Sequence, residues 1–288
     1  MKVTIGIPTF NRKELLEIMA KSLYDSDLAG VCNIRIYDDC STAYDEDYLR
    51  KLFPTAVTIK VNLRNIGADK NMYQMYKDFL ESGDDYFFNA DSDIIFNSEW
   101  LNKGIEMINR TEGILSLFNA NSHKSYSMIG NEFCLKESIG AAGTLFTRDR
   151  MFELFQHFNS LDDIGNFDWQ WSGYLREQGV KIFCVQNSLI QHIGFEGQNS
   201  NMYFDVGEKF KIESALQGQI INDIYVKSIS AIMMKEKERV ANEAQLHALR
   251  ANDLGYHIKR CFVILVKKGI PKKVYSRIKR ISLLSVKI

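Results

Sequence analysis

Residues 3–25 read VTIGIPTFNRKELLEIMAKSLYD, and this stretch contains the signals of a strand followed by a helix. The apolar run VTIGI at residues 3–7 ends at Pro8, as a buried strand ends at a turn. In residues 13–25, apolar side chains recur at the spacing of one helix face, at Leu15, Leu16, Met19 and Leu23. The chain therefore opens with a βα unit.

The same alternation of strand and helix continues over the next 65 residues or so. We expect strands at NIRIYDD (33–39), AVTIKVN (56–62) and DYFFNAD (85–91), with helices at 46–53 and 68–80 between them. Because strands that alternate with helices form βαβ units, we predict an α/β fold with a mostly parallel central sheet flanked by helices. Ligands of such sheets bind beyond the carboxyl ends of the strands.

The second half of the chain is less regular. Its expected strands are GILSLFN (113–119), AAGTLFT (141–147) and VKIFCVQ (180–186). Helices are expected at 150–158 and 168–178, and residues 206–253 look mainly helical because they are rich in strong helix formers. The sequence contains no internal repeat and no low-complexity linker.

Composition indicates one large globular domain, alone or with an appendage. The chain has 288 residues, of which 45% are hydrophobic and 25% charged, enough to bury one large core. The N-terminus lacks a long apolar segment, and no run of about 18 apolar residues occurs, so we expect neither a signal peptide nor a membrane span. The five scattered cysteines favour reduced thiols in a cytoplasm, which makes the sequon at Asn109 a chance match.

The net charge of zero hides an asymmetry along the chain. Ten lysines and arginines follow Asp253 and no acid does, so residues 1–253 keep 26 of the 36 basic residues against 36 acids, a net charge of about −10. The basic tail from residue 257 mixes cationic clusters with the apolar run Phe262–Val266, which suits an anionic membrane surface. Packing against the domain or a partner chain is the alternative, and we expect no nucleic-acid partner.

Asp91 and Asp93 directly follow an expected buried strand in FFNADSDIIF (87–96). Burying two carboxylates without partners is costly, so we expect the strand to end at the acids and a cation to lie there. Mg²⁺ accepts one or two carboxylates and fills its other positions with phosphate oxygens and water. The alternative is a solvated turn. Because residues 8–12 and 38–39 also fall at strand ends, three polar clusters are predicted to converge on one edge of the sheet.

Seven segments resemble, in their order along the chain, the family 2 glycosyltransferases of the GT-A fold. They are TIGIPTFNR (4–12), IRIYDDCS (34–41), NLRNIGADKNM (62–72), NADSD (89–93), AAGTLFTRDRMFE (141–153), FDWQW (167–171) and QHIG (191–194). The resemblance covers about residues 1–195. It implies a GT-A catalytic domain at 1–205, with a nucleotide-binding half at about 1–95 and an acceptor half at about 96–205. A mainly helical, basic extension would follow at 206–288.

The resemblance also implies a set of residues that bind the nucleotide-sugar. Residues 8–12 match the first nucleotide-contacting loop, Asp39 matches the acid that accepts from the imide N–H of uracil or thymine, and residues 65–71 match a turn and helix start that can face phosphate. The nucleotide-binding set is Pro8, Thr9, Asn11, Arg12, Asp39, Asn65, Gly67, Asn71 and Asp91.

The metal site and the catalytic base follow from the same resemblance. Asp93 matches the direct ligand of a divalent metal, Mn²⁺ or Mg²⁺, with Asp91 nearer the ribose and also counted among the metal residues. His192 matches a histidine that adds a metal or diphosphate contact. Asp168 matches the catalytic base near the start of a helix, although Phe167 stands where the family commonly has a second acid.

Each assignment has a structural alternative. For Asp39 the alternative is a cap of the loop after its strand, which is our preferred interpretation of Asp38. For His192 it is a hydrogen-bonded structural histidine, and for Asp168 an ordinary acid at a helix N-terminus. Trp169 and Trp171 suit the core as well as an acceptor platform, and the loop between residues 116 and 140 has no obvious acceptor signature.

Together these features predict an inverting, metal-dependent glycosyltransferase of the hexosyltransferase type. The expected donor is a UDP-sugar and the acceptor a hydroxyl of a saccharide or lipid-linked saccharide, in the synthesis of bacterial surface polysaccharide or glycoconjugates. The expected location is the cytoplasm or the inner face of the plasma membrane, and a homo-oligomer is compatible with the sequence. The alternatives are a non-catalytic nucleotide-binding module and a sugar-nucleotide pyrophosphorylase. A pyrophosphorylase would open with a Gly-rich loop, and the segment GIPTFNRKE of this chain does not resemble such a loop.

Overall fold

The structure is a computed structural model that describes residues 1–28, 32–120, 124–140, 142–157, 167–194 and 205–252. The chain divides into two compact units, Met1–Ser228 and Ile229–Ile288. The basic tail predicted from residue 257, and Cys261 with it, lie outside the described residues. The domain boundary at residue 205 stays a prediction.

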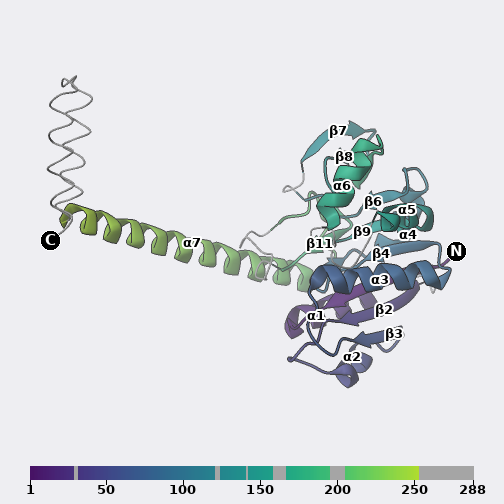
Figure 1. Cartoon of the computed structure of the whole chain (residues 1–288), viewed down its shortest axis with the longest axis horizontal. Helices are drawn as coiled ribbons and strands as arrows, with labels where there is room; N and C mark the ends of the chain where they lie inside the picture. Colours follow the sequence, from purple (N-terminus) through teal and green to yellow (C-terminus); the bar gives the residue numbers. More distant parts are fainter. Residues whose placement is uncertain (29–31, 121–123, 141, 158–166, 195–204, 253–288) are drawn as a thin grey trace, which may run out of the picture. The chain divides into compact units, whose positions relative to one another are not determined.

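Within the described residues, nine strands form the central sheet of the first unit, in the order β3-β2-β1-β4-β9-β6-β10-β8-β7 (Figure 1). Parallel pairing extends from β3 through β2 and β1 to β4 and recurs between β6 and β10, whereas β9, β8 and β7 pair antiparallel to their neighbours. The strands are β1 (Val3–Thr9), β2 (Cys32–Asp38), β3 (Ala56–Val61), β4 (Tyr86–Asn89), β6 (Ile114–Ser116), β7 (Ser125–Ile129), β8 (Phe133–Lys136), β9 (Thr144–Thr147) and β10 (Ile182–Val185).

Helices cover both faces of this sheet. Alternate strand residues point to opposite faces, so Phe88 of β4 joins one core cluster and Phe87 joins the other. The first cluster takes apolar side chains from α1 (Lys13–Asp25), α2 (Glu46–Leu52) and α4 (Trp100–Ile108). The second takes them from α3 (Ala68–Ser82), α5 (Arg148–Gln156) and α6 (Phe167–Glu177). The predicted α/β fold with a large central sheet between helices is confirmed.

A separate two-stranded sheet joins β5 (Ile94–Phe96) to β11 (Ile190–His192) in antiparallel register. His192 pairs with Ile94, and the Ile193 N–H donates to the Asp93 carbonyl at 2.8 Å. This pairing connects segments nearly 100 residues apart and brings His192 next to Asp93. The sequence did not predict it.

Helix α7 (Ala215–Asn252) begins in the first unit and continues into the second. Its range agrees with the expected helical segment at 206–253. Among the described helices, α7 included, none combines the length and apolar character that crossing a bilayer requires. The four cysteines in the described residues are free thiols, as expected.

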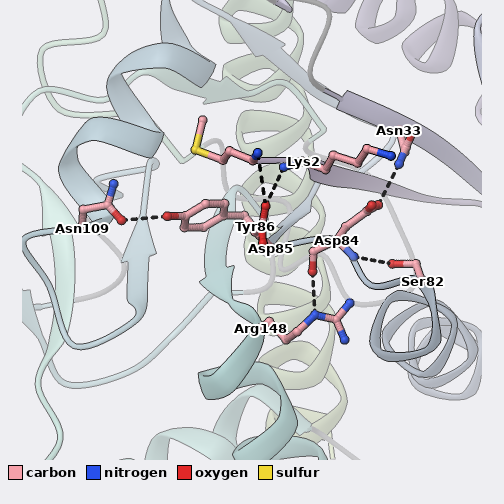
Figure 2. A network of polar contacts seen from close by, with 9 residues as sticks. Lys2, Asn33, Ser82, Asp84, Asp85, Tyr86, Asn109 and Arg148 are labelled. Carbon is pink, nitrogen blue, oxygen red and sulfur yellow. Dashed lines mark hydrogen bonds and ion pairs between the residues drawn. The ribbon is translucent and has the colours of Figure 1, made fainter.

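The edge of the sheet at the amino ends of β1, β2 and β4 is held by the polar network in Figure 2. The buried Asp84 carboxylate accepts from the Thr4 hydroxyl at 2.6 Å and from Asn33 Nδ2 at 2.9 Å. The Arg148 guanidinium donates to the carbonyls of Phe79, Leu80 and Asp84 at 2.7–3.0 Å. Arg148 thereby donates to carbonyl groups in the last turn of α3, where backbone N–H partners are lacking, and the Phe79 carbonyl also accepts from the Ser82 hydroxyl at 2.7 Å.

We expect Arg148→Ala to lower the free energy of unfolding by about 2–4 kcal/mol, because it removes charge-assisted hydrogen bonds and leaves half-buried carbonyls unsatisfied. Urea unfolding followed by circular dichroism measures the change. Arg50→Ala is the matched control: Arg50 forms an exposed i,i+4 ion pair with Glu46, whose loss should cost only about 0.3–0.5 kcal/mol. Equal losses in the two variants would contradict the role of Arg148.

Candidate active site

A cavity of about 480 Å³ opens where β1, β2 and β4 end, and its volume is typical of small-molecule sites. Eleven of the twelve predicted site residues line it, namely Pro8, Thr9, Asn11, Arg12, Asp39, Asn65, Gly67, Asn71, Asp91, Asp93 and His192. Asp168 is not among the lining residues. Five further residues line the cavity without having been predicted: Phe10, Ala68, Met72, Ser92 and Gly194. The three predicted polar clusters therefore meet at one edge of the sheet.

The loop after β1 is fixed to the loop after β2 by Asn11. Its side-chain oxygen accepts from the backbone N–H groups of Thr42 at 2.9 Å and Ala43 at 3.1 Å. Both Asn11 and Arg12 have left-handed backbone conformations, with φ of 53° and 54°. Such conformations are uncommon for residues other than glycine and concentrate at functional sites.

The two acids at the end of β2 have different partners. Asp38 accepts from the Ser41 N–H at 2.8 Å and from the Thr9 hydroxyl at 2.9 Å, so it caps the loop as expected. The Asp39 carboxylate accepts from the N–H groups of Ile66 at 2.8 Å and Gly67 at 2.9 Å and from Asn62 Nδ2 at 3.0 Å. Asp39 therefore connects the end of β2 to the turn that precedes α3.

The start of α3 forms another wall of the cavity. Gly67 precedes the helix with a φ of 90°, a conformation that favours glycine. Asn71, in the first turns, donates from its side chain to the Tyr37 carbonyl at 2.8 Å and is buried. Because the first N–H groups of a helix have no intrahelical partner, this wall suits an anionic group.

Asp93 lies between two cationic partners. Its Oδ2 forms an ion pair with the Arg12 guanidinium, and its Oδ1 accepts from His192 Nε2 at 3.2 Å. The Asp93 side chain is only 5% exposed, which argues against the alternative of a solvated turn. Asp91 is half-buried, and its Oδ1 accepts from Asn89 Nδ2 at 2.8 Å.

The pKa values of these groups reflect the crowding of charge. Burial would raise the pKa of Asp93, but the charges and hydrogen bonds of His192 and Arg12 outweigh burial and lower it. Burial and the charge of Asp93 raise the pKa of Asp91 to about 6. Burial opposes protonation of His192, yet the charge and hydrogen bond of Asp93 raise its pKa above the ordinary value. The cationic side chains of the protein therefore compensate the negative charge of Asp93 but not that of Asp91.

Gly194 permits the close packing around Asp93. A Cβ atom at this position would lie 2.0 Å from Asp93 Oδ2 and 3.3 Å from Arg12 Nη1. Any side chain at this position would thus displace the ion pair. The segment QHIG contained the residue, but only the contact with Asp93 reveals why glycine is required.

The donor set fits a hard divalent cation that is shared with a phosphate ligand. Asp91 and Asp93 supply carboxylate oxygens at one point, and the raised pKa of Asp91 indicates a need for further positive charge. Among the described residues, no three His, Cys, Asp or Glu side chains are grouped as the ligands of a metal ion. A cation held here would accordingly take its other ligands from the nucleotide and from water.

Asp168 is the second residue of α6, and its Oδ1 accepts from the Trp169 N–H at 2.9 Å. It acts electrostatically on Tyr76: burial, followed by the charges of Asp91 and Asp168, raises the pKa of that buried phenol well above its usual value. Trp171 is buried in the core, whereas Trp169 is 63% exposed. Of the two tryptophans, only Trp169 is available as an acceptor platform.

The parallel β3-β2-β1-β4 arrangement, with an acidic cavity at its carboxyl edge, is the architecture of an α/β protein of the GT-A type. Residues 4–155 match the family model described as glycosyl transferase family 2. The chain belongs to this family. No curated protein matches the chain at a significant level.

Two solved structures support the GT-A fold. The structure of residues 1–349 of TarS from S. aureus aligns with a TM-score of 0.51 and 13% sequence identity, covering 78% of this chain and 71% of that one. GalNAc-T7, crystallised with UDP, GalNAc and Mn²⁺, aligns with a TM-score of 0.56 and 12% identity, covering 80% of this chain and 48% of that one. The predicted GT-A fold is confirmed.

Proposed function

We propose that this member of glycosyl transferase family 2 moves a hexose from a UDP-sugar to a hydroxyl acceptor in a metal-dependent reaction that inverts the anomeric centre. The observation that supports the proposal best is the cavity itself, where an acid pair, an arginine and a helix start converge at the carboxyl edge of a parallel sheet. This combination suits a nucleoside diphosphate, since each part addresses a different portion of that ligand.

Asp39 is the residue proposed to bind the base. Its carboxylate accepts three hydrogen bonds within the protein, whereas a carboxylate has about four acceptor positions. One further donor, the imide N–H of uracil, would complete the set. Because cytosine has no such N–H, UDP should bind more tightly than CDP.

The diphosphate is proposed to lie between Asp93 and the start of α3. A divalent metal bound by Asp93 and Asp91 would stabilise the negative charge that develops on the leaving diphosphate. Arg12, which pairs with Asp93, is positioned to orient a phosphate oxygen, and the Gly67–Ala68 backbone lines the same cavity. His192 holds Asp93 from the other side, and a contact of its own with metal or diphosphate stays a prediction.

Asp168 is proposed to accept the proton of the attacking hydroxyl. Attack on the face opposite the leaving diphosphate is a single displacement, so the product would have the inverted configuration. Phe167, which precedes Asp168, has its ring centroid 5.6 Å from that of Tyr76 in α3, and the start of α3 lines the cavity of about 480 Å³, here called the donor cavity. This contact supports a location of Asp168 near the donor cavity. We assign no other residue as the base.

The remaining parts of the proposal concern the acceptor and its setting. GalNAc-T7, a structural neighbour, was crystallised with UDP, GalNAc and Mn²⁺, which supports a UDP-sugar and a divalent metal. The acceptor is proposed to be a saccharide or lipid-linked saccharide of bacterial surface polysaccharide synthesis. The cytoplasmic location, the membrane contact through the basic tail and a homo-oligomer stay predictions from the sequence.

Calorimetry with UDP and Mn²⁺ tests the proposal at its first step. UDP should bind more tightly with Mn²⁺ than without it and more tightly than CDP under the same conditions. Absence of UDP binding would contradict the proposal, and equal affinities for UDP and CDP would contradict the role of Asp39. UDP binding without turnover on any acceptor would favour the non-catalytic module, and formation of UDP-sugar from UTP and a sugar phosphate would favour the pyrophosphorylase.

Gly194→Ala should weaken UDP binding in the presence of Mn²⁺ by about tenfold or more, since the added methyl group would push Asp93 away from its partners. Gly173→Ala is the control, because a Cβ at that half-buried position of α6 meets no atom within 4 Å. The control variant should bind UDP as the wild type does. Wild-type affinity in Gly194→Ala would show that the contact with Asp93 is unimportant.

A further inference from the structure

A second cavity, of about 340 Å³, lies between the segment after β6, the β7–β8 hairpin and the segment around Glu208. We call it the lysine cavity, because Lys124, Lys136 and Lys209 line it together with a single acid, Glu208. None of these residues belongs to the site described above. The lysine cavity therefore has an excess of positive charge, although residues 1–253 as a whole are acidic.

The three lysines differ in exposure. Lys136 is only 4% exposed, and its ammonium donates to the Ala120 carbonyl at 3.0 Å. Lys124 and Lys209 are exposed, and neither makes an ion pair within the part of the chain that the structure describes. Lys209 also has a left-handed backbone conformation, with a φ of 53°. Because three ammonium groups and one carboxylate line the cavity, its charge suits an anion.

Hydrogen bonds fix the walls of the lysine cavity. Asn119 donates from Nδ2 to the Gln186 carbonyl at 2.9 Å, and its own carbonyl accepts from the Glu208 N–H at 2.8 Å. Ala120 and Gly207 form an isolated antiparallel bridge. These contacts hold the segments at Asn119–Ala120 and Gly207–Glu208 against each other and so fix one wall of the cavity before a ligand binds.

The lysine cavity and the cavity of the candidate active site share no lining residue, but two contacts join the segments that line them. Phe118, which precedes Asn119, has its ring centroid 6.3 Å from that of His192. The N–H of Gly207, which precedes Glu208, donates at 2.8 Å to Oε1 of Gln191, which precedes His192. An acceptor with several units could thus contact both cavities.

We propose that the lysine cavity is a subsite for an anionic group, a phosphate or a carboxylate, of the glycosyl acceptor. The identification of this ligand as the acceptor rests on the proposed function, whereas anion binding in the lysine cavity does not. The charge pattern favours an acidic saccharide or a phosphodiester-linked polymer over a neutral sugar.

The test is a calorimetric titration of the full chain with glycerol 1-phosphate, glucuronate and glucose, in excess UDP and Mg²⁺ so that the donor cavity is filled. Wild-type protein should bind at least one of the two anions and bind glucose more weakly, and the preferred anion distinguishes phosphate from carboxylate. Lys124→Glu combined with Lys209→Glu should weaken that binding by more than about tenfold. Lys77→Glu combined with Lys227→Glu changes the net charge equally at exposed helix positions outside the lysine cavity and should bind as wild type.

Lys136→Met gives a second measurement, with circular dichroism as a check that the variant folds. A folded Lys136→Met variant should lose anion binding while its affinity for UDP stays at the wild-type value. Wild-type anion affinity in the Lys124→Glu, Lys209→Glu variant, or glucose binding equal to that of the anions, would overturn the proposal. If wild-type protein does not bind UDP, the proposed function is overturned instead, and the anion titration is then repeated without UDP.

Discussion

Asp93→Asn is expected to abolish the gain in UDP affinity that Mn²⁺ provides, leaving a folded protein that binds UDP at least about 100-fold more weakly in the presence of the metal. Mutation of a group that only supports a metal ligand already lowers metal affinity or activity by about 10–100-fold, so loss of a direct carboxylate ligand should lower it more. Asparagine keeps the size of the side chain and one oxygen acceptor for Arg12 and His192. The fold should therefore survive, which circular dichroism can verify.

Calorimetric titration of UDP with and without Mn²⁺ measures this effect. Asp85→Asn is the control, since Asp85 is an exposed acid at the opposite edge of the sheet, where it accepts from the Lys2 N–H at 2.7 Å. That variant should retain both the UDP affinity and its dependence on Mn²⁺. If Asp93→Asn keeps the metal-dependent gain, the assignment of Asp93 as a ligand is wrong.

Asp168→Asn is expected to lower kcat by about 10²- to 10⁴-fold while the affinity for UDP-sugar persists, because asparagine retains the shape of the side chain but cannot take up a proton. Enzymatic detection of released UDP measures turnover, and calorimetry measures donor affinity. If Asp168 interacted only with the dipole of α6, the substitution would lower the free energy of unfolding by a few tenths of a kcal/mol and leave turnover unchanged.

Asp149 offers a matched control for this substitution. It is an exposed acid in the first turn of α5, the position that Asp168 occupies in α6, and it does not line the donor cavity. Asp149→Asn should therefore affect stability slightly and turnover not at all. Near-normal turnover in Asp168→Asn would show that another group accepts the proton.

The first half of the fold was predictable because its signals are local. The strands β1 to β4 lie in short stretches that contain β-branched or aromatic residues and are bounded by Pro, Asn or Asp, although β1 continues past Pro8 to Thr9. The helices between them show one apolar face. The parallel sheet follows from that alternation. The convergence of residues 8–12, 38–39 and 91–93 at one edge then follows from the sheet.

Several elements were missed because their stability depends on distant contacts. Helix α4 (Trp100–Ile108) was missed although its buried residues recur at helical spacing, because it is short, contains Gly104 and has no side-chain cap. Strands β5 and β11 have three residues each and exist because they pair with one another. The hairpin of β7 and β8 was likewise missed, since the alternation Ser-Tyr-Ser-Met in β7 covers only four residues and β7 is exposed along its whole length.

The sequence predicted which residues form the candidate site but not how they contact one another. Motif resemblance named eleven of the residues that line the donor cavity, yet it did not indicate that Asp93 is buried between Arg12 and His192. The requirement for glycine at residue 194 depends on a contact across the β5–β11 pairing. Single-sequence reasoning cannot supply such a contact.

One measurement tests the central claim most directly. Wild-type protein is incubated with Mn²⁺ and, in turn, with UDP-glucose, UDP-galactose, their N-acetyl forms and UDP-glucuronate, and slow hydrolysis is followed by proton NMR before the sugar mutarotates. We predict that at least one α-linked donor releases UDP with the β-anomer of the sugar appearing first, and that Asp93→Asn abolishes the release. Failure of every donor to release UDP, or first appearance of the α-anomer, would contradict an inverting UDP-sugar transferase.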